Sequence, residues 1–181
     1  VYLDEATGLP NKNKCEEILN KPKLLTTEDA VAVCVFDLNN LRMINNNLGH
    51  DKGDAYIRSF AGQLRAAMPE DAFVGRDGGD EFLAVLTGKN HTEVQECLAG
   101  VRKSVKLYSR QHPEMPISYA AGYALSDDYE PCTMRMLFKQ ADKNMYVDKN
   151  HAKMEEAAER QRKNRSLLAW VREQEYYFTD C

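Results

Sequence analysis

Two short β-prone runs joined by an acidic, glycine-containing turn constrain the fold most strongly. The runs are residues 72–76 and 81–87, and Asp77-Gly78-Gly79-Asp80 lies between them. Asp-Gly and Gly-Gly are strong local signals for a β-hairpin, because glycine adopts a positive φ without a Cβ clash. The sequence therefore predicts an antiparallel pair with Asp77, Asp80 and Glu81 at its tip. Acids on an exposed turn are most often simply solvated, so the hairpin alone does not establish a site.

A second β-prone segment is an uninterrupted apolar run. Residues 30–38 read AVAVCVFDL, which is typical of a central strand buried on both faces. Cys34 is therefore expected in the core, and Asp37 lies near the end of the strand. If this strand lies beside the hairpin, Asp37 meets Asp80 and Glu81, and such carboxylates together with substrate phosphates suit Mg²⁺. Spacing alone does not establish that the two strands are neighbours.

The rest of the chain is mostly helical in pattern. Helices are expected over residues 11–20, 39–48 (short helix or turn), 54–68, 90–111 (opened by an Asn90–Glu93 capping box), 131–149 and 151–180, and a further strand over 116–125. Gly122 inside that strand suggests close backbone approach. The order predicts an α+β fold: a central, mostly antiparallel sheet flanked by helices, with a palm-like or ferredoxin-like βαββαβ core. We expect one domain over residues 1–154 and a long helical extension over 155–181.

Composition excludes several classes of protein. The 181 residues are 43% hydrophobic and 29% charged, an ordinary globular profile, and the net charge of −4 argues against nucleic-acid binding through bulk electrostatics. Five widely spaced Cys form no CxxC pair, which argues against a zinc ribbon or a disulfide framework and favours a reducing, cytoplasmic compartment. No signal peptide or membrane-spanning run is present, so no membrane contact by this segment is expected. The chain begins at Val1 without Met, and we interpret it as a fragment of a longer protein.

Five motifs, in order, resemble those of the GGDEF family, whose members are typically diguanylate cyclases. They are TGLPN (7–11), VFDLNNLRMINN (35–46), GHDKGD (49–54), GGDEF (78–82) and ADKNMY (141–146), with Asn144 in place of the usual Ala. The resemblance covers residues 4 to about 153. It implies a nucleotide cyclase-like fold that condenses two GTP into cyclic di-GMP and two pyrophosphates. It also implies a homodimer, and an upstream sensor domain in a cytoplasmic or membrane-anchored parent protein.

The resemblance assigns a metal site to the two strand ends. Asp37 and Asp80 would bind Mg²⁺ or Mn²⁺ through their carboxylates, assisted by the Leu38 carbonyl. Glu81 would be either a second-metal ligand or the base for the ribose 3′-hydroxyl, and both roles stay open. Gly78 and Gly79 would let the backbone approach the nucleotide closely.

The resemblance also assigns guanine and phosphate contacts. Asn45 and Asp54 would bind guanine, because an amide both donates and accepts and a carboxylate accepts from the N1 and N2 hydrogens. The structural alternative is that Asn45 caps a turn and Asp54 N-caps the next helix. Backbone N–H groups around Asn40 and Leu41 would bind phosphates. Further positive charge would come from Arg42, Lys149 and Lys153, which are otherwise solvated surface cations.

Several positions depart from the family pattern. Asn39 and Asn46 stand where the family often has acids, and Lys153 replaces an Arg, which loses the bidentate fork. Pro69 and Ala72 occupy the Arg-x-x-Asp positions of product-inhibited members, so no intact inhibitory site is expected. Two alternatives remain: a non-catalytic GTP-binding module that regulates a neighbouring domain, and another nucleotidyl transferase or cyclase on a palm-like fold. The expected guanine contacts argue against the second, if it uses ATP.

Overall fold

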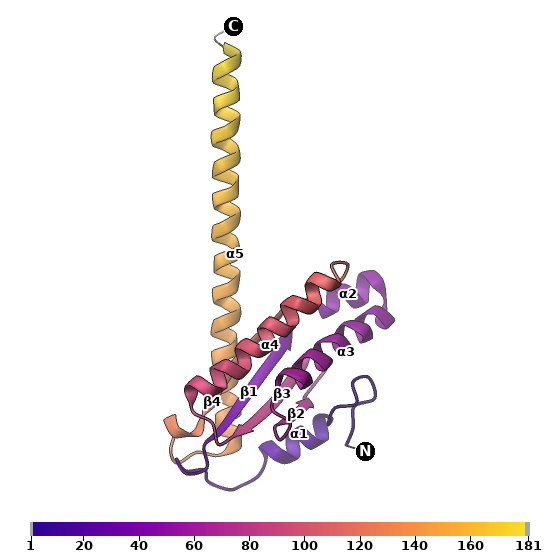
Figure 1. The fold of residues 1–181 in the computed structure, drawn as a ribbon, viewed down its shortest axis with the longest axis vertical. Coiled ribbons are helices and arrows are strands. Elements are labelled where there is room, and N and C mark those ends of the chain that lie inside the picture. The colour runs from indigo at the N-terminus through magenta and orange to yellow at the C-terminus, as the bar shows by residue number, and fades with distance from the viewer. Residues whose placement is uncertain (1, 180–181) are drawn as a thin grey trace. The chain divides into compact units, whose positions relative to one another are not determined.

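The computed structural model describes the backbone of residues 2–179 and the side chains of 2–147 and 154–175. The chain divides into two compact units, Val1–Tyr146 and Val147–Cys181. The elements in order (Figure 1) are α1 (Lys12–Leu19), β1 (Val31–Leu38), α2 (Leu41–Leu48), α3 (His50–Ala67), β2 (Phe73–Arg76), β3 (Glu81–Thr87), α4 (His91–Gln111), β4 (Tyr119–Leu125), the 3₁₀ helix η1 (Ser126–Asp128) and α5 (Met134–Thr179). The two C-terminal helices expected from the sequence are one continuous helix, α5.

The first unit is built on a four-stranded sheet in the order β2-β3-β1-β4. Every neighbouring pair in it is antiparallel. Helices α2 and α3 connect β1 to β2, and α4 connects β3 to β4. The predicted α+β class, hairpin and central strand are therefore confirmed. Apart from Asp37, every residue of β1 is apolar and buried, as expected for a strand that lies between β3 and β4 and is covered on both faces.

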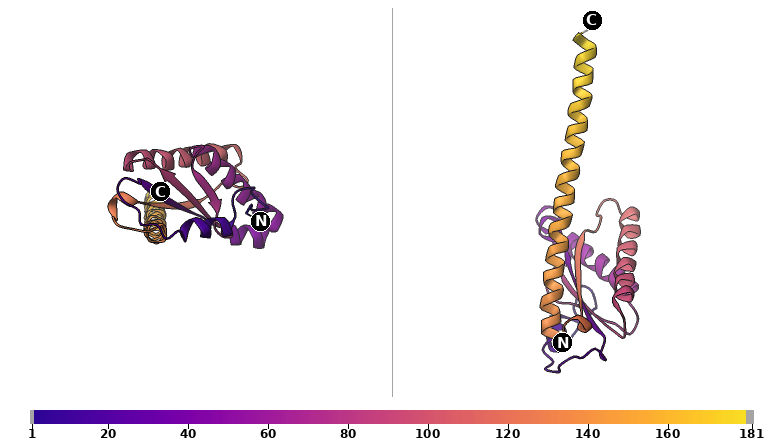
Figure 2. Two further views of the ribbon diagram at one scale, coloured as in Figure 1. Left: turned by 90° about the horizontal axis from the view of Figure 1, so that it is seen from below. Right: turned by 90° about the vertical axis from the view of Figure 1, so that its left-hand side faces the viewer.

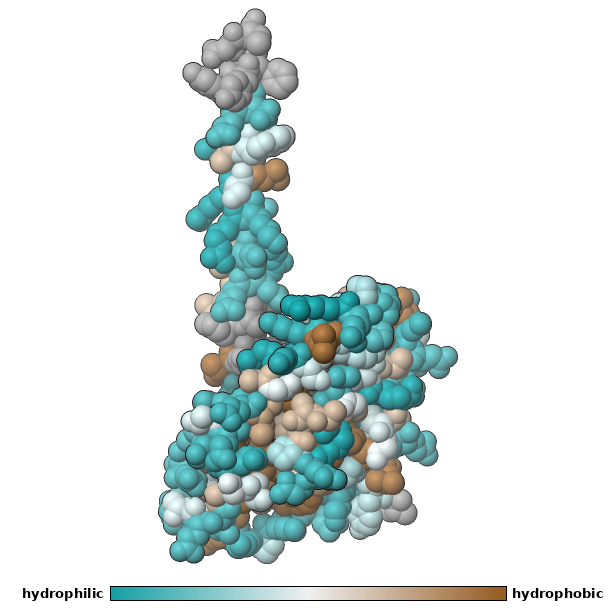
Figure 3. Space-filling model, in the orientation of Figure 1, coloured by the Kyte–Doolittle hydropathy of each residue, from teal (hydrophilic) through white to brown (hydrophobic). Residues whose placement is uncertain are grey.

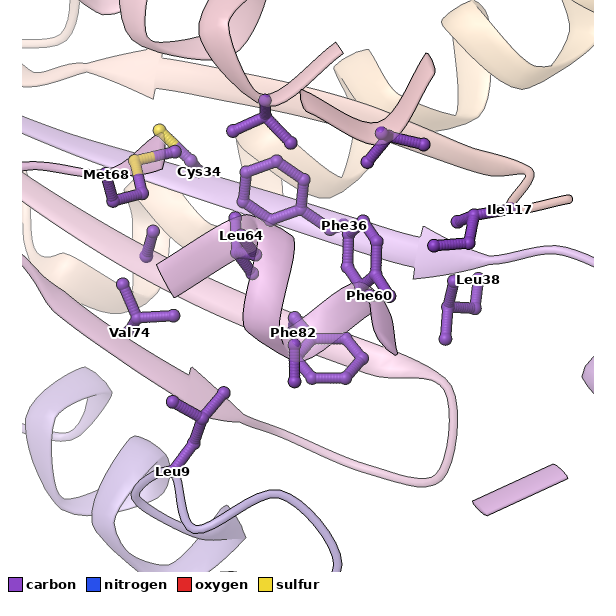
Figure 4. Packing of buried hydrophobic residues seen from close by; sticks show 14 of the residues in the cluster. Leu9, Cys34, Phe36, Leu38, Phe60, Leu64, Met68, Val74, Phe82 and Ile117 are labelled. Carbon is purple, nitrogen blue, oxygen red and sulfur yellow. The ribbon is translucent and has the colours of Figure 1, made fainter. Parts of the chain in front are cut away.

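Each face of the sheet has its own core, because successive residues of a strand point to opposite sides. On one face Phe36 packs with Phe60 of α3 and Phe82 of β3 (Figure 4). The centroid of the Phe60 ring lies 6.2 Å from that of the Phe36 ring and 5.1 Å from that of the Phe82 ring. Cys34 belongs to this cluster and is fully buried, as predicted. On the other face Val33 and its neighbours pack against α1 and the first turns of α5 (Figure 2).

Gly122 allows α5 to approach β4 closely. A Cβ at this position would meet the backbone nitrogen of Met145, the carbonyl oxygen of Ala141 at 2.5 Å and the Cα of Met145 at 2.7 Å. The close approach predicted from this glycine is confirmed. Asn144 adds a hydrogen bond from its amide to the carbonyl of Tyr123, 2.8 Å long.

Element boundaries follow the predictions to within two residues except at the starts of three elements: β4, α3, and α5, which begins at Met134 rather than Pro131. The Asn90–Glu93 capping box is present. Strand β4 begins at Tyr119 rather than Pro116, because the N–H of Ser118 donates to a tyrosine hydroxyl instead of to a strand. Helix α3 begins at His50 rather than Asp54, with Gly49 as N-cap at φ 91°.

The predicted helix start at Asp54 was wrong because the four residues before it continue the helix. Gly53 lies inside α3, where a Cβ would collide with the side-chain oxygen of Asn45. Its lack of a side chain therefore serves packing between α2 and α3. Asp54 consequently lies inside the helix, and the alternative in which it N-caps α3 is wrong.

Candidate functional site

Strand register brings two of the candidate acids together. Asp37 of β1 is paired with Glu81 of β3 on one side and with Ala120 of β4 on the other. Directly opposed residues of an antiparallel pair project to the same face with Cβ atoms about 4.5–5.5 Å apart. Asp37 shares its face with Val33 and Val35, so both carboxylates lie on the side of the sheet that carries α1 and the start of α5.

The environment of Glu81 is strongly acidic. Partial burial raises its pKa above the ordinary value, and the negative charges of Asp37, Asp77, Asp80 and Asp142 raise it further. Asp142 comes from α5, so three segments of the chain contribute acids. Mg²⁺ prefers such hard oxygen donors and needs only one or two protein carboxylates beside substrate phosphates. The residues present therefore fit a magnesium ion, although nowhere in residues 2–147 and 154–175 do three or more His, Cys, Asp or Glu side chains already form a metal-binding group.

The acidic turn is held by hydrogen bonds rather than by unusual glycine geometry. The N–H of Asp77 donates to the Glu81 carbonyl, and the N–H of Leu38 donates to the Asp80 carbonyl, both over 2.8 Å. Neither Gly78 nor Gly79 has a left-handed φ, so the positive-φ hairpin turn predicted from Asp-Gly-Gly is wrong. The turn is longer than a two-residue loop, and a neighbouring side chain satisfies its carbonyls.

That side chain is Arg76, which belongs to none of the sequence motifs described above. Its guanidinium donates to the carbonyls of Gly78 at 3.0 Å and Gly79 at 2.8 Å, and forms a largely buried ion pair with Asp4 at 3.1 Å. Burial raises the pKa of Asp4, but hydrogen bonds from Thr7 and Arg76 and the charge of Arg76 lower it overall. The N-terminal loop is thereby tied to the acidic turn. An arginine directly before an acidic turn was the available signal.

Asp77 does not lie at the tip of the hairpin. Its residue is 7% exposed, and its Oδ1 has no hydrogen-bond partner among the described residues. Burial and the negative charge of Glu16 raise its pKa to about 6, while the charges of Lys12 and Arg135 act in the opposite direction. The prediction of a third exposed tip acid is therefore wrong, because Asp77 turns inward toward charged groups of α1 and α5.

The two expected guanine contacts lie where α2 meets α3. Asn45 is half-buried in α2, and its side-chain oxygen lies against the space that Gly53 leaves open. Asp54 follows Gly53 directly and is exposed. The Asn45 carbonyl accepts from the N–H of Gly49, the C-cap residue of α2, at 3.1 Å. This bond uses only the backbone of Asn45 and leaves its amide side chain for other contacts.

The expected phosphate contacts lie at the start of α2. Asn40 is its N-cap at φ 69°, and the Asn40 side chain makes no capping hydrogen bond there. The Asn40 side chain therefore accepts no hydrogen bond from the backbone N–H groups of the first turn of α2, which begins at Leu41. Arg42 is exposed on this turn. Lys149 and Lys153 lie outside the residues whose side chains the structure describes.

Tyr56 braces the connection between the sheet and α2, a role that no motif in the sequence indicated. Its hydroxyl donates to the Asn39 carbonyl at 2.9 Å and accepts from the N–H of Ser118 at 3.0 Å. The ring is fully buried, and burial raises the pKa of the hydroxyl. The amide of Asn39 also donates to the Ser118 hydroxyl at 3.0 Å. Tyr56 thus fixes the backbone directly after Asp37.

Comparison with known proteins gives consistent matches. A family model described as "Diguanylate cyclase, GGDEF domain" matches residues 1–155. The Signaling protein YkoW of Bacillus subtilis is 31% identical over an alignment of 159 residues that covers 84% of this chain and 20% of the relative. An uncharacterized membrane protein of Staphylococcus saprophyticus is 27% identical over an alignment of 158 residues that covers 83% of this chain and 44% of the relative. The chain thus spans less than half the length of either relative.

A solved structure has the same fold. The GGDEF domain of DgcB from Caulobacter crescentus, in complex with c-di-GMP, aligns with a TM-score of 0.66 at 21% identity, covering 83% of this chain and 91% of that one. At this identity the likeness supports the fold. No helix within the described part of the chain is both long and apolar enough to cross a bilayer.

Proposed function

Because the chain belongs to the GGDEF domain family, we propose that it is a diguanylate cyclase domain that condenses two GTP into cyclic di-GMP and two pyrophosphates. The observation that carries this proposal is the direct pairing of Asp37 with Glu81 beside the acidic turn. Family membership alone does not establish activity, whereas this pairing supplies the carboxylates that the chemistry needs. The domain would act in bacterial second-messenger signalling.

The acidic edge of the sheet would hold the metal. Asp37 and Asp80 would bind Mg²⁺ or Mn²⁺ with the Leu38 carbonyl, and a bound ion there would neutralise phosphate charge during the reaction. The raised pKa of Glu81 supports its role as the base that takes the proton from the ribose 3′-hydroxyl, because a carboxylate with a higher pKa is a stronger base. The second role, as a ligand of another metal ion, would use the same side chain.

The α2–α3 corner would bind the rest of the nucleotide. Asn45 and Asp54 would hydrogen-bond the guanine edge, since they lie on neighbouring helices on either side of Gly53. Uncapped N–H groups at Asn40 and Leu41 would bind phosphates, as helix N-termini do. Arg42, Lys149 and Lys153 would add positive charge, and Gly78 and Gly79 would leave room for the nucleotide.

Two copies of the domain would form one reaction site. The 3′-oxygen of each GTP forms a bond to the α-phosphorus of the other, and the bond from that phosphorus to the β-phosphate bridging oxygen breaks. Each domain would hold one GTP, so catalysis requires a homodimer. A sensor domain upstream in a longer protein would control the encounter of the two copies.

A direct assay tests the proposal. The chain, dimerised by a fused N-terminal coiled coil, is incubated with GTP and Mg²⁺, and products are separated by liquid chromatography and identified by mass spectrometry. We expect cyclic di-GMP, loss of turnover in Asp80→Asn, and unchanged turnover in Asp127→Asn, which removes an exposed acid of η1. Absence of product from the dimerised chain would exclude the cyclase activity.

A regulatory GTP-binding module is the second candidate. The observation that favours it is Asn39, whose amide donates to Ser118 where the family often has an acid. A GTP-dependent rise in the melting temperature without turnover would support this function. Loss of that rise in Asn45→Ala would then locate the bound nucleotide at the α2–α3 corner.

A further inference from the structure

The second unit carries an apolar patch on an otherwise charged helix. Leu167, Leu168, Trp170 and Val171 are between 38% and 59% exposed. Polar and charged side chains dominate the surface of this helix around them (Figure 3). Four large apolar side chains within five residues of an isolated helix leave substantial hydrophobic area in water. This exposure is unfavourable unless another surface covers it.

The spacing of the patch fits the seam of a coiled coil. With Asn164 and Val171 at a positions, Leu167 and Gln174 occupy d positions. A β-branched residue at a and Leu at d favour two parallel strands, and a single Asn at a specifies register and oligomeric state. Leu168 and Trp170 then flank the seam at e and g, where their side chains widen the apolar contact.

Charge favours a helix rather than a lipid surface as the occupant. Residues 154–175 contain five basic residues (Arg160, Arg162, Lys163, Arg165, Arg172) and five acidic residues (Glu155, Glu156, Glu159, Glu173, Glu175). Their net charge is therefore zero, whereas helices that bind anionic membranes carry an excess of Lys and Arg on the polar face. In the heptad register above, Arg162, Arg165 and Glu173 fall on the outer side, away from a partner helix.

We propose that residues 164–175 pair in parallel with the same segment of a second copy of this chain. The proposal rests on the proposed function, because condensation of two GTP needs two nucleotide-loaded domains and the site of one copy is incomplete. A parallel pair places the two first units at the same end of the paired helices, whereas an antiparallel pair places them at opposite ends. The short seam gives a dimer whose population rises with protein concentration.

The first test is the association constant of the full chain, measured by sedimentation velocity over a wide concentration range. We expect a monomer–dimer equilibrium that the double variant Leu167→Asp/Val171→Asp weakens by at least about 100-fold, because two seam side chains become charged. The matched control, Ser166→Asp/Ala169→Asp, adds the same charge at outer positions and should leave the constant unchanged. Circular dichroism of each variant measures whether helix content is retained. A wild-type chain that stays monomeric, or an equal loss in the control, would overturn the proposal.

Cross-linking determines the orientation. In a background with Cys97→Ser and Cys181→Ser, oxidised Asn164→Cys should form a symmetric disulfide-linked dimer, because identical a positions face each other in a parallel pair. Cross-linking only between Asn164→Cys and Gln174→Cys chains would show an antiparallel pair and overturn the proposal. A monomeric chain whose patch binds vesicles of anionic phospholipid would do so as well.

A chimera separates this proposal from the cyclase function. Residues 164–179 are replaced by an unrelated parallel two-stranded zipper, and dimerisation and GTP turnover are measured for the chimera and the wild type. If both dimerise and neither makes cyclic di-GMP, the cyclase function fails and the pairing stands. If the chimera is active and the wild type is monomeric, the cyclase function stands and the pairing is overturned.

Discussion

Replacing Gly122 with alanine should push α5 away from β4, because the new Cβ meets backbone atoms that cannot rotate aside. Those atoms are the nitrogen of Met145, the Ala141 carbonyl oxygen at 2.5 Å and the Met145 Cα at 2.7 Å. Real Cβ atoms essentially never approach closer than 3.0 Å. Relief therefore requires the helix to move, and with it Leu137, Ala141 and Met145 of the core on that face of the sheet.

The expected cost follows from two opposing effects. Overpacking of a well-packed core costs about 1–3 kcal/mol, and a clash with backbone places this variant at about 3 kcal/mol. Alanine restricts the unfolded chain more than glycine does, which offsets roughly 0.5–1 kcal/mol. The net loss in free energy of unfolding is about 2–2.5 kcal/mol, or roughly 4–10 °C in melting temperature for a chain of this size.

Calorimetry and urea denaturation followed by circular dichroism measure this loss. Tryptophan fluorescence is a poor probe, because the one tryptophan of the sequence, Trp170, lies in the second unit. The matched control is Gly100→Ala in α4, where a Cβ meets nothing within 4 Å and should stabilise the helix by about 0.5–1 kcal/mol. A Gly122→Ala variant within about 0.5 kcal/mol of the wild type would refute this reasoning.

Three further predictions concern the candidate site. Asp77→Asn should raise the free energy of unfolding at pH 8 by about 2–3 kcal/mol, because a folded pKa of about 6 against an ordinary 3.8 means that folding favours the protonated carboxyl. This gain should shrink as pH falls through 6 toward 4, where the wild type recovers its stability. Urea denaturation at pH 8 and pH 4 measures the gain, with Asp127→Asn as the control. Tyr56→Phe should cost about 1 kcal/mol in the same assay, because two partly buried hydrogen bonds to the backbone are lost. An unchanged stability would contradict that role. Gly53→Ala should raise the KM for GTP about tenfold with little change in melting temperature, because the new Cβ displaces the Asn45 side chain. An unchanged KM would exclude Asn45 as a guanine contact.

Local patterns in the sequence were sufficient to predict most of the fold. The two β-prone runs on either side of the glycine-containing turn predicted the strands of the hairpin, and the continuous apolar run predicted the central strand β1. Capping chemistry predicted the start of α4 from Asn90 and Glu93. These predictions are correct because residues close in sequence determine each of these features. Once the order of the elements is known, few antiparallel arrangements of the strands remain possible.

Features determined by distant segments could not be predicted in the same way. Asp77 points inward because α1 and α5 approach the turn. The residues around the turn do not indicate that either helix lies nearby. The role of Gly53 could not be predicted, because its contact with Asn45 forms only when α2 and α3 pack together. Arg76 was missed because its partners, the turn carbonyls and Asp4, are backbone groups and a residue 72 positions away in sequence.

The acids of the candidate site are held together by the apolar core, against their own repulsion. The raised pKa of Glu81 shows that the charged form is disfavoured in the folded protein, so the carboxylates do not drive the pairing of β1 with β3. The register instead follows from apolar pairs in the same ladder, Val35 with Leu83 and Phe36 with Phe82, which belong to different cores on opposite faces. A slip by one residue would exchange these faces and expose or overfill both cores. The core therefore fixes the spacing of Asp37 and Glu81, and a bound cation would relieve a repulsion that the fold already sustains.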